Sequence, residues 1–137
     1  MRRRMGGRRS LRELVPPKPR PYAEQLEAIA TRDGDTLLKE LEGAIREQQQ
    51  DRACALVQCY GQQGYDARPA FNLLLKFAIS EDGALHAEKY YRTTSDEFAS
   101  TRPSFRWRQL VALARVTASE FGRPTDGYAE ACELLKV

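Results

Sequence analysis

The only histidine of the chain, His86, is the side chain best suited to acid–base chemistry or metal binding near neutral pH. Glu88 follows two residues later, and Tyr90 follows four residues later, on the same face of a helix as His86. A histidine beside a carboxylate can act as a general base, but no Cys-x-x-Cys pair follows to complete a zinc site. We therefore interpret His86 as a surface or interface residue. A helical subunit or fragment of a larger enzyme, with His86 at its functional site, stays open as an alternative.

The three cysteines, Cys54, Cys59 and Cys132, have neither the number nor the spacing of a disulfide framework or a zinc site. On one helix, Cys54 and Cys59 would lie about 140° apart around the axis, so we expect them to pack as small buried hydrophobic residues. The sequence also lacks a glycine-rich phosphate loop in a strand–turn–helix context. We therefore predict no metal, no cofactor and no catalytic residue. The odd number of cysteines favours a reducing compartment, either the cytoplasm or an organelle matrix.

Cationic and aromatic side chains are better candidates for binding than for catalysis. In the run Arg106-Trp107-Arg108, the tryptophan shares a helical face with the apolar residues that follow, so we expect it to anchor the core. Arg108 and Arg115 are seven residues apart and should share a partly exposed face. Tyr90 and Tyr91 are adjacent, so one of them should face a partner or a groove. The predicted partner-binding residues are Tyr90, Tyr91, Arg106, Arg108 and Arg115.

The beginning of the chain differs in composition from the rest. Residues 1–20 carry eight cationic side chains against one carboxylate, a net +7, so residues 21–137 must carry −4 for the whole chain to reach +3. A segment this rich in Arg and Pro cannot bury enough apolar surface to offset the entropy lost on ordering. We predict a disordered or extended basic tail at 1–21 and one helical domain at 22–137.

Three roles for this tail stay open. It is a solvated tail or a start-site extension, or an Arg-rich and acid-poor organelle transit peptide, or an arm that contacts RNA or a larger assembly. In the last case the nucleic-acid-binding residues would be Arg2, Arg3, Arg4, Arg8 and Arg9. The acidic balance of the domain does not favour a general nucleic-acid-binding surface there. No apolar run approaches the roughly 18–20 residues of a membrane span, and we expect none.

Apolar residues recur at helical spacing throughout 22–137, and no alternating run indicates a strand. We predict an all-α domain of about seven helices, at roughly 22–31, 36–48, 51–60, 69–79, 84–98, 103–121 and 126–135. Side-chain oxygens at three positions are expected to cap helix N-termini. These capping residues are Asp35 or Thr36, Asp51, and Thr125 or Asp126.

Two signatures each occur twice in the second half of the chain. Arg68-Pro69-Ala70-Phe71 returns as Arg102-Pro103-Ser104-Phe105, 34 residues later, and Asp82-Gly83-Ala84 is echoed by Asp126-Gly127-Tyr128, 44 residues later. A period near 34 built from two helices is typical of helical repeat arrays. We predict antiparallel hairpins at 36–63, 69–100 and 103–137, stacked as a short array or a compact bundle. Phe71 and Phe105 should then have equivalent surroundings, and Leu135 should face inward.

Residues 51–135 resemble tetratricopeptide and pentatricopeptide repeats. The run 68–75 is similar to the first helix of a pentatricopeptide unit, in which an aromatic residue precedes Asn72, and Asp82-Gly83 followed by Ala87 is similar to the opening of its second helix. Arg106 stands where Asn72 stands, so a one-base-per-repeat code is not carried over. The resemblance implies stacked right-handed hairpins with a concave binding surface. It favours an interaction or scaffold module for a protein partner, with an RNA-associated repeat protein as the alternative.

Overall fold

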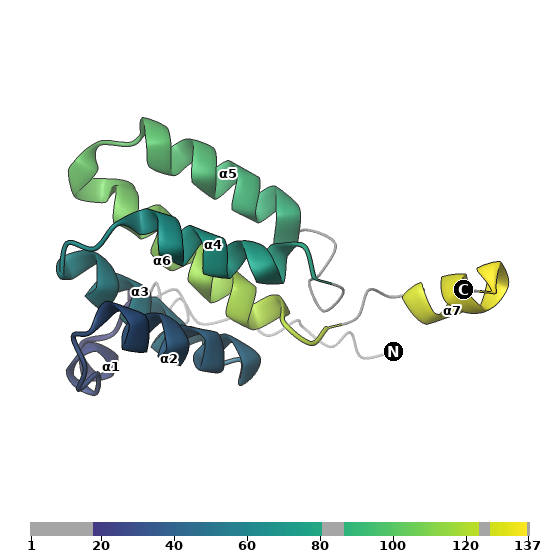
Figure 1. The fold of residues 1–137 in the computed structure, drawn as a ribbon, viewed down its shortest axis with the longest axis horizontal. Coiled ribbons are helices and arrows are strands. Elements are labelled where there is room, and N and C mark those ends of the chain that lie inside the picture. The colour runs from purple at the N-terminus through teal and green to yellow at the C-terminus, as the bar shows by residue number, and fades with distance from the viewer. Residues whose placement is uncertain (1–17, 81–86, 124–126, 137) are drawn as a thin grey trace, which may run out of the picture.

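The computed structural model describes residues 18–80, 87–123 and 127–136, and all regular structure in these ranges is helical. Seven α-helices follow one another along the described chain (Figure 1). Their bounds are α1 Ala23–Glu27, α2 Gly34–Arg46, α3 Gln50–Gln62, α4 Ala67–Ala78, α5 Ala87–Ser100, α6 Pro103–Glu120 and α7 Tyr128–Leu135. The prediction of an all-α domain is confirmed.

Helix α6 is the central element of a compact bundle. It packs against α2, α3, α4 and α5, and its interface with α3 is the most extensive between any two helices. Helix α1 packs on α3, and α2 lies against both α3 and α4. In Figure 1, α5, α4 and α2 lie one above another, and α6 runs behind α4. Among the described residues, the packing is therefore that of the compact bundle, one of the two architectures expected from the sequence.

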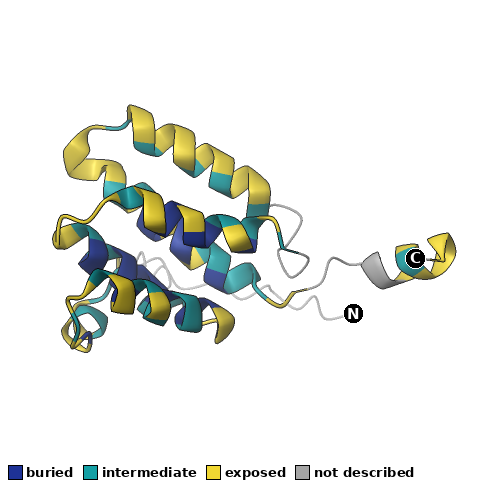
Figure 2. Cartoon of the chain, viewed as in Figure 1, coloured by how far each residue is buried: buried dark blue, intermediate teal, exposed yellow. Residues whose placement is uncertain are grey.

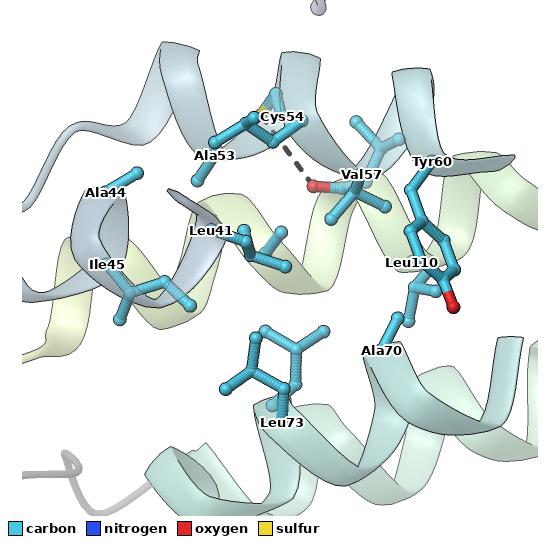
Figure 3. Packing of buried hydrophobic residues seen from close by; sticks show 14 of the residues in the cluster. Leu41, Ala44, Ile45, Ala53, Cys54, Val57, Tyr60, Ala70, Leu73 and Leu110 are labelled. Atoms are coloured by element: carbon cyan, nitrogen blue, oxygen red, sulfur yellow. Dashed lines mark hydrogen bonds between the residues drawn. The ribbon is translucent and has the colours of Figure 1, made fainter. Parts of the chain in front are cut away.

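The core between these helices is apolar. Its largest fully buried side chains come from α2, α3, α4 and α6, as the close view in Figure 3 illustrates. They are Leu37, Leu41, Ile45, Cys54, Leu56, Val57, Leu74 and Leu110. No charged residue in the described part of the chain is buried. Any described charged side chain that takes part in function therefore lies at the surface of the bundle.

Two of the expected helix caps are wrong. Helix α2 is capped by Asp33, whose carboxylate accepts a hydrogen bond from the Thr36 backbone N–H at 2.9 Å. Helix α3 follows Gln49 rather than Asp51, because the Gln49 N–H donates to the Ala44 carbonyl at 2.8 Å and closes the connection early. The cap residue of α7 is Gly127, at φ +85°, whereas Thr125 and Asp126 lie outside the described residues.

Trp107 anchors the core, as its helical position predicted. Its ring lies on the backbone of Gly61 in α3, so closely that a Cβ atom at Gly61 would be 2.6 Å from the indole. Phe98 of α5 meets Trp107 edge-on at 5.7 Å between ring centroids, and Phe71 of α4 meets Phe98 edge-on at 5.1 Å. These contacts join α3, α4, α5 and α6 through aromatic rings.

The expected equivalence of Phe71 and Phe105 is wrong. Phe71 is buried against Phe98, whereas the side chain of Phe105 is 44% exposed at the start of α6. The prediction that Leu135 faces inward is also wrong, because Leu134 and Leu135 are 75% and 71% exposed. Figure 2 shows α7 standing apart from the bundle, with exposed residues along it. The reason is that the apolar side of α6 is already covered by α2, α3, α4 and α5. No part of that apolar side is left for α7 to pack against.

Candidate functional site

Helix α6 has one side in the core and one side in solvent. Leu110, Val111, Leu113, Ala114 and Ala118 are buried. The opposite side exposes Phe105, Arg108, Ala112 and Arg115, whose spacing of three, four and three residues follows one helical face. The Arg108 guanidinium lies over the Phe105 ring at 5.1 Å. Neither Arg108 nor Arg115 forms an ion pair with a carboxylate among the described residues.

The segment at residues 18–21 runs beside this face and makes it concave. Two adjoining cavities, of about 520 Å³ and 290 Å³, lie between the segment and α6. Both are lined by Pro19, Arg20, Arg108 and Val111. We name this region the α6 groove, and define it by the residues Lys18, Pro19, Arg20, Pro21, Leu26, Cys54, Gln58, Arg108, Val111, Ala112 and Arg115.

Arg20 fastens the 18–21 segment to the bundle. Its guanidinium forms an ion pair with Asp51 near the start of α3, and it also lies over the Tyr22 ring at 5.1 Å. The hydrogen bond to Asp51 is the main reason why the pKa of Arg20 is raised. Asp51 neutralises Arg20, and it forms no ion pair with another described cation of the groove. The α6 groove therefore keeps an excess of positive charge from Lys18, Arg108 and Arg115.

Cys54 forms part of the floor of the groove. Its thiol is buried and donates a hydrogen bond to the Val111 carbonyl at 3.7 Å, the dashed line in Figure 3. Burial raises the pKa of the Cys54 thiol to about 11, although Arg20 and Arg115 act in the opposite direction. The thiol is therefore protonated at neutral pH, which makes it a packing group rather than a nucleophile. Cys54 and Cys59 are both buried, as the sequence indicated.

Arg106 lies away from the α6 groove. Its guanidinium lies over the Phe98 ring at 5.2 Å. It lines a separate cavity of about 350 Å³ together with Tyr65, Asp66 and Trp107. Because Arg106 and Arg108 are two residues apart on a helix, they point to different sides of α6. The structure thus separates two arginines that the sequence placed in one motif.

The adjacent tyrosines of α5 point in different directions. Tyr91 is half-buried and meets Phe71 edge-on at 5.9 Å, so it belongs to the packing of the bundle. Tyr90 is 46% exposed. This is the division expected for the pair, with Tyr90 as the outward residue. Neither tyrosine lines the α6 groove.

Several predicted residues lie outside the described part of the chain. They are the tail arginines Arg2, Arg3, Arg4, Arg8 and Arg9, and His86. Within the described ranges, no group of three His, Cys, Asp or Glu residues could hold a metal ion. No helix in those ranges has the length and apolar character needed to cross a membrane.

Sequence reasoning did not find the groove residues outside α6. Lys18 and Arg20 belong to the charged tail by composition, and Gln58 carries no chemical signal of its own. The one available hint was Pro19 and Pro21, since two prolines around Arg20 favour an extended segment that can lie along a helix. The side on which such a segment lies depends on tertiary packing, which helical periodicity does not contain.

Comparison of the chain with family models, curated proteins and solved structures gave no significant match. The resemblance of residues 51–135 to tetratricopeptide and pentatricopeptide repeats therefore stays a prediction.

Proposed function

We propose that this chain is a non-enzymatic helical interaction module that binds a protein partner in the α6 groove. One observation carries the proposal: the solvent side of the central helix presents Arg108 and Arg115 around a small Ala112, with no described carboxylate to pair with them. A concave face that keeps one sign of charge suits a partner of the opposite sign.

The apolar content of the groove supports a protein partner. Pro19, Pro21, Leu26, Val111 and Ala112 all contribute to its lining, and Phe105 is exposed next to it. Protein interfaces combine an apolar centre with a charged rim, and Arg is enriched in them. We therefore expect the partner to supply apolar side chains to the floor and carboxylates to the arginines.

The test begins with peptides selected from a random displayed library on the immobilised full chain. We expect the selected peptides to be acidic and to contain apolar residues, and their dissociation constants are then measured by titration calorimetry. The double variant Arg108→Glu/Arg115→Glu should weaken binding about tenfold or more, because each pair becomes repulsive. Unchanged affinity in this variant, with the fold verified by circular dichroism, would contradict the proposal.

The matched control is Lys39→Glu/Arg92→Glu. It makes the same change in net charge at two exposed positions of α2 and α5, outside the groove. We expect it to bind the selected peptides with the affinity of the native chain. A loss equal to that of the groove variant would indicate a general charge effect rather than a defined site. Tyr90→Ala, measured in parallel, tests whether α5 belongs to the binding surface.

RNA is the second candidate ligand, and one observation favours it. Lys18, which directly follows the basic residues 1–17 in sequence, lines the groove and adds to its positive charge. If this reading holds, single-stranded RNA binds with an affinity that falls steeply as salt concentration rises. Deleting residues 1–17 removes the tail and leaves the groove wall, so a large loss of RNA affinity would assign binding to the tail. Peptide binding that survives this deletion would favour the protein partner.

A further inference from the structure

The strongest candidate for the occupant of the α6 groove is on the chain itself. We propose that α7 of a second copy docks in this groove, so that two copies exchange their C-terminal helices. The inference rests on the proposed function, because it takes the same groove as the binding site. It adds the identity of the partner.

Helix α7 exposes apolar side chains without extensive packing on another helix of the described chain. Leu134 and Leu135 are 75% and 71% exposed. In Figures 1 and 2, α7 stands beyond the end of α6, away from the bundle. A helix this short is marginal in water on its own, and most of its stability has to come from packing against another surface.

The charges of α7 are opposite to those of the groove. The only charged residues within Tyr128–Leu135 are Glu130 and Glu133, and both are exposed. They are three residues apart and share one edge of the helix, and Leu134 lies beside Glu130 one turn later. On α6, Arg108 and Arg115 share one edge, with Phe105 and Ala112 beside them. Each helix therefore carries a charged stripe next to an apolar stripe, and the two charged stripes are opposite in sign.

The position of α7 favours docking on a second copy. Helix α7 stands beyond the end of α6 in Figure 1, and it packs extensively on no other helix of the described chain. A helix that stands outside its own bundle is suited to exchange between identical chains. A two-fold symmetric dimer would contain the α7 contact twice, so this small interface would contribute twice to the free energy of association.

The test exploits the reciprocity of exchanged helices. One full-length variant carries Arg108→Glu/Arg115→Glu, and the other carries Glu130→Lys/Glu133→Lys. In each variant alone, groove and helix have the same sign and should repel. In an equimolar mixture, both contacts become complementary again. Sedimentation equilibrium, with the concentration raised into the millimolar range, measures the mass of each sample.

We expect the native chain to shift from its monomer mass of 15.6 kDa to about twice that value as concentration rises. Each charge variant should stay monomeric, and the mixture should regain the double mass. A monomeric native chain, or dimers that persist in both variants, would overturn the inference. A monomeric native chain that still binds acidic peptides through Arg108 and Arg115 would overturn α7 as the occupant and leave the proposed function standing. The Lys39→Glu/Arg92→Glu control should dimerise like the native chain.

Discussion

The indole of Trp107 rests directly on the backbone of Gly61, and this contact sets how closely α3 and α6 approach. A Cβ atom at Gly61 would lie 2.6 Å and 2.8 Å from two carbons of the indole. Since α3 and α6 form the most extensive helix–helix interface, a residue larger than glycine at this position must shift the central pair.

Gly61→Ala is therefore expected to destabilise the fold by about 1–3 kcal/mol, the usual cost of overpacking a close contact. Urea denaturation followed by circular dichroism gives the free energy of unfolding. Gly43→Ala is the matched control, because a Cβ atom there meets nothing within 4 Å and Gly43 is inside α2. It should gain roughly 0.5–1 kcal/mol from helix propensity. Equal effects of the two substitutions would mean that Trp107 does not restrict Gly61.

Asp33 should stabilise α2 only while its carboxylate is ionised. Its pKa is lowered by hydrogen bonds from the Thr36 hydroxyl and then from the Thr36 N–H. A lowered folded-state pKa means that the contribution is present above the ordinary Asp value, near pH 4, and is lost as pH falls through the folded pKa. We expect Asp33→Ala to lower the thermal midpoint at pH 7 and to have little effect once the pH is below the lowered pKa of Asp33. Asp35→Ala, which removes a carboxylate from the same turn, should change the midpoint less.

Cys54 should resist thiol reagents in the native state. Its pKa is raised from 9.0 to about 11 by burial, and the thiolate is the reactive form. At pH 8 we expect a chromogenic disulfide reagent to label the partly exposed Cys132 of α7 rapidly, and the buried Cys54 and Cys59 only after unfolding. Rapid labelling of Cys54 in the native chain would mean that the floor of the groove opens easily.

The same thiol gives a prediction for stability at alkaline pH. Because the pKa of Cys54 is higher in the folded state than in the unfolded state, the protonated thiol contributes to the free energy of unfolding. This contribution is fully present below pH 9 and is lost as the pH rises toward 11. The free energy of unfolding should therefore decrease across this window. In Cys54→Ala the free energy of unfolding should decrease less steeply with pH. The comparison uses the slope against pH, because the substitution also changes the absolute stability.

The ion pair between Arg20 and Asp51 should hold the 18–21 segment against α3. Both side chains are partly exposed, so the pair is worth at most about 1 kcal/mol. Asp51→Asn should leave global stability nearly unchanged but increase chymotryptic cleavage after Tyr22, because the segment detaches more often and uncovers the Tyr22 ring over which Arg20 lies. Glu42→Gln, which removes the partner of Arg46 on α2, is the control and should not change cleavage after Tyr22. Unaltered cleavage in Asp51→Asn would show that the prolines alone hold the segment.

Helical periodicity predicted the individual helices well because it reports which side of each is apolar. The start of α6 at Pro103 and the inward position of Trp107 both followed from such local signals. The likeness of the runs around Phe71 and Phe105 was misleading, because the same four-residue pattern begins a helix in either environment. Whether that helix is then covered by neighbours on one side or on several is decided by contacts between distant segments.

The candidate site could be predicted only in part for the same reason. Arg108 and Arg115 were placed on one exposed face by their spacing alone. Arg106 was grouped with them because it is close in sequence, although a helix turns it to another side. Lys18 and Pro19 complete the groove from a part of the chain about 90 residues away, and no periodicity connects positions so distant.

The aromatic contacts around Trp107 also give the molecule a built-in optical probe. Trp107 is the only tryptophan of the chain, and its ring lies 6.1 Å from Tyr60 of α3 and 5.7 Å from Phe98 of α5 between centroids. Its emission therefore arises where α3, α5 and α6 meet, and excitation of Tyr60 should transfer energy to it in the folded state. Loss of that transfer would report the separation of α3 from α6 without any added label.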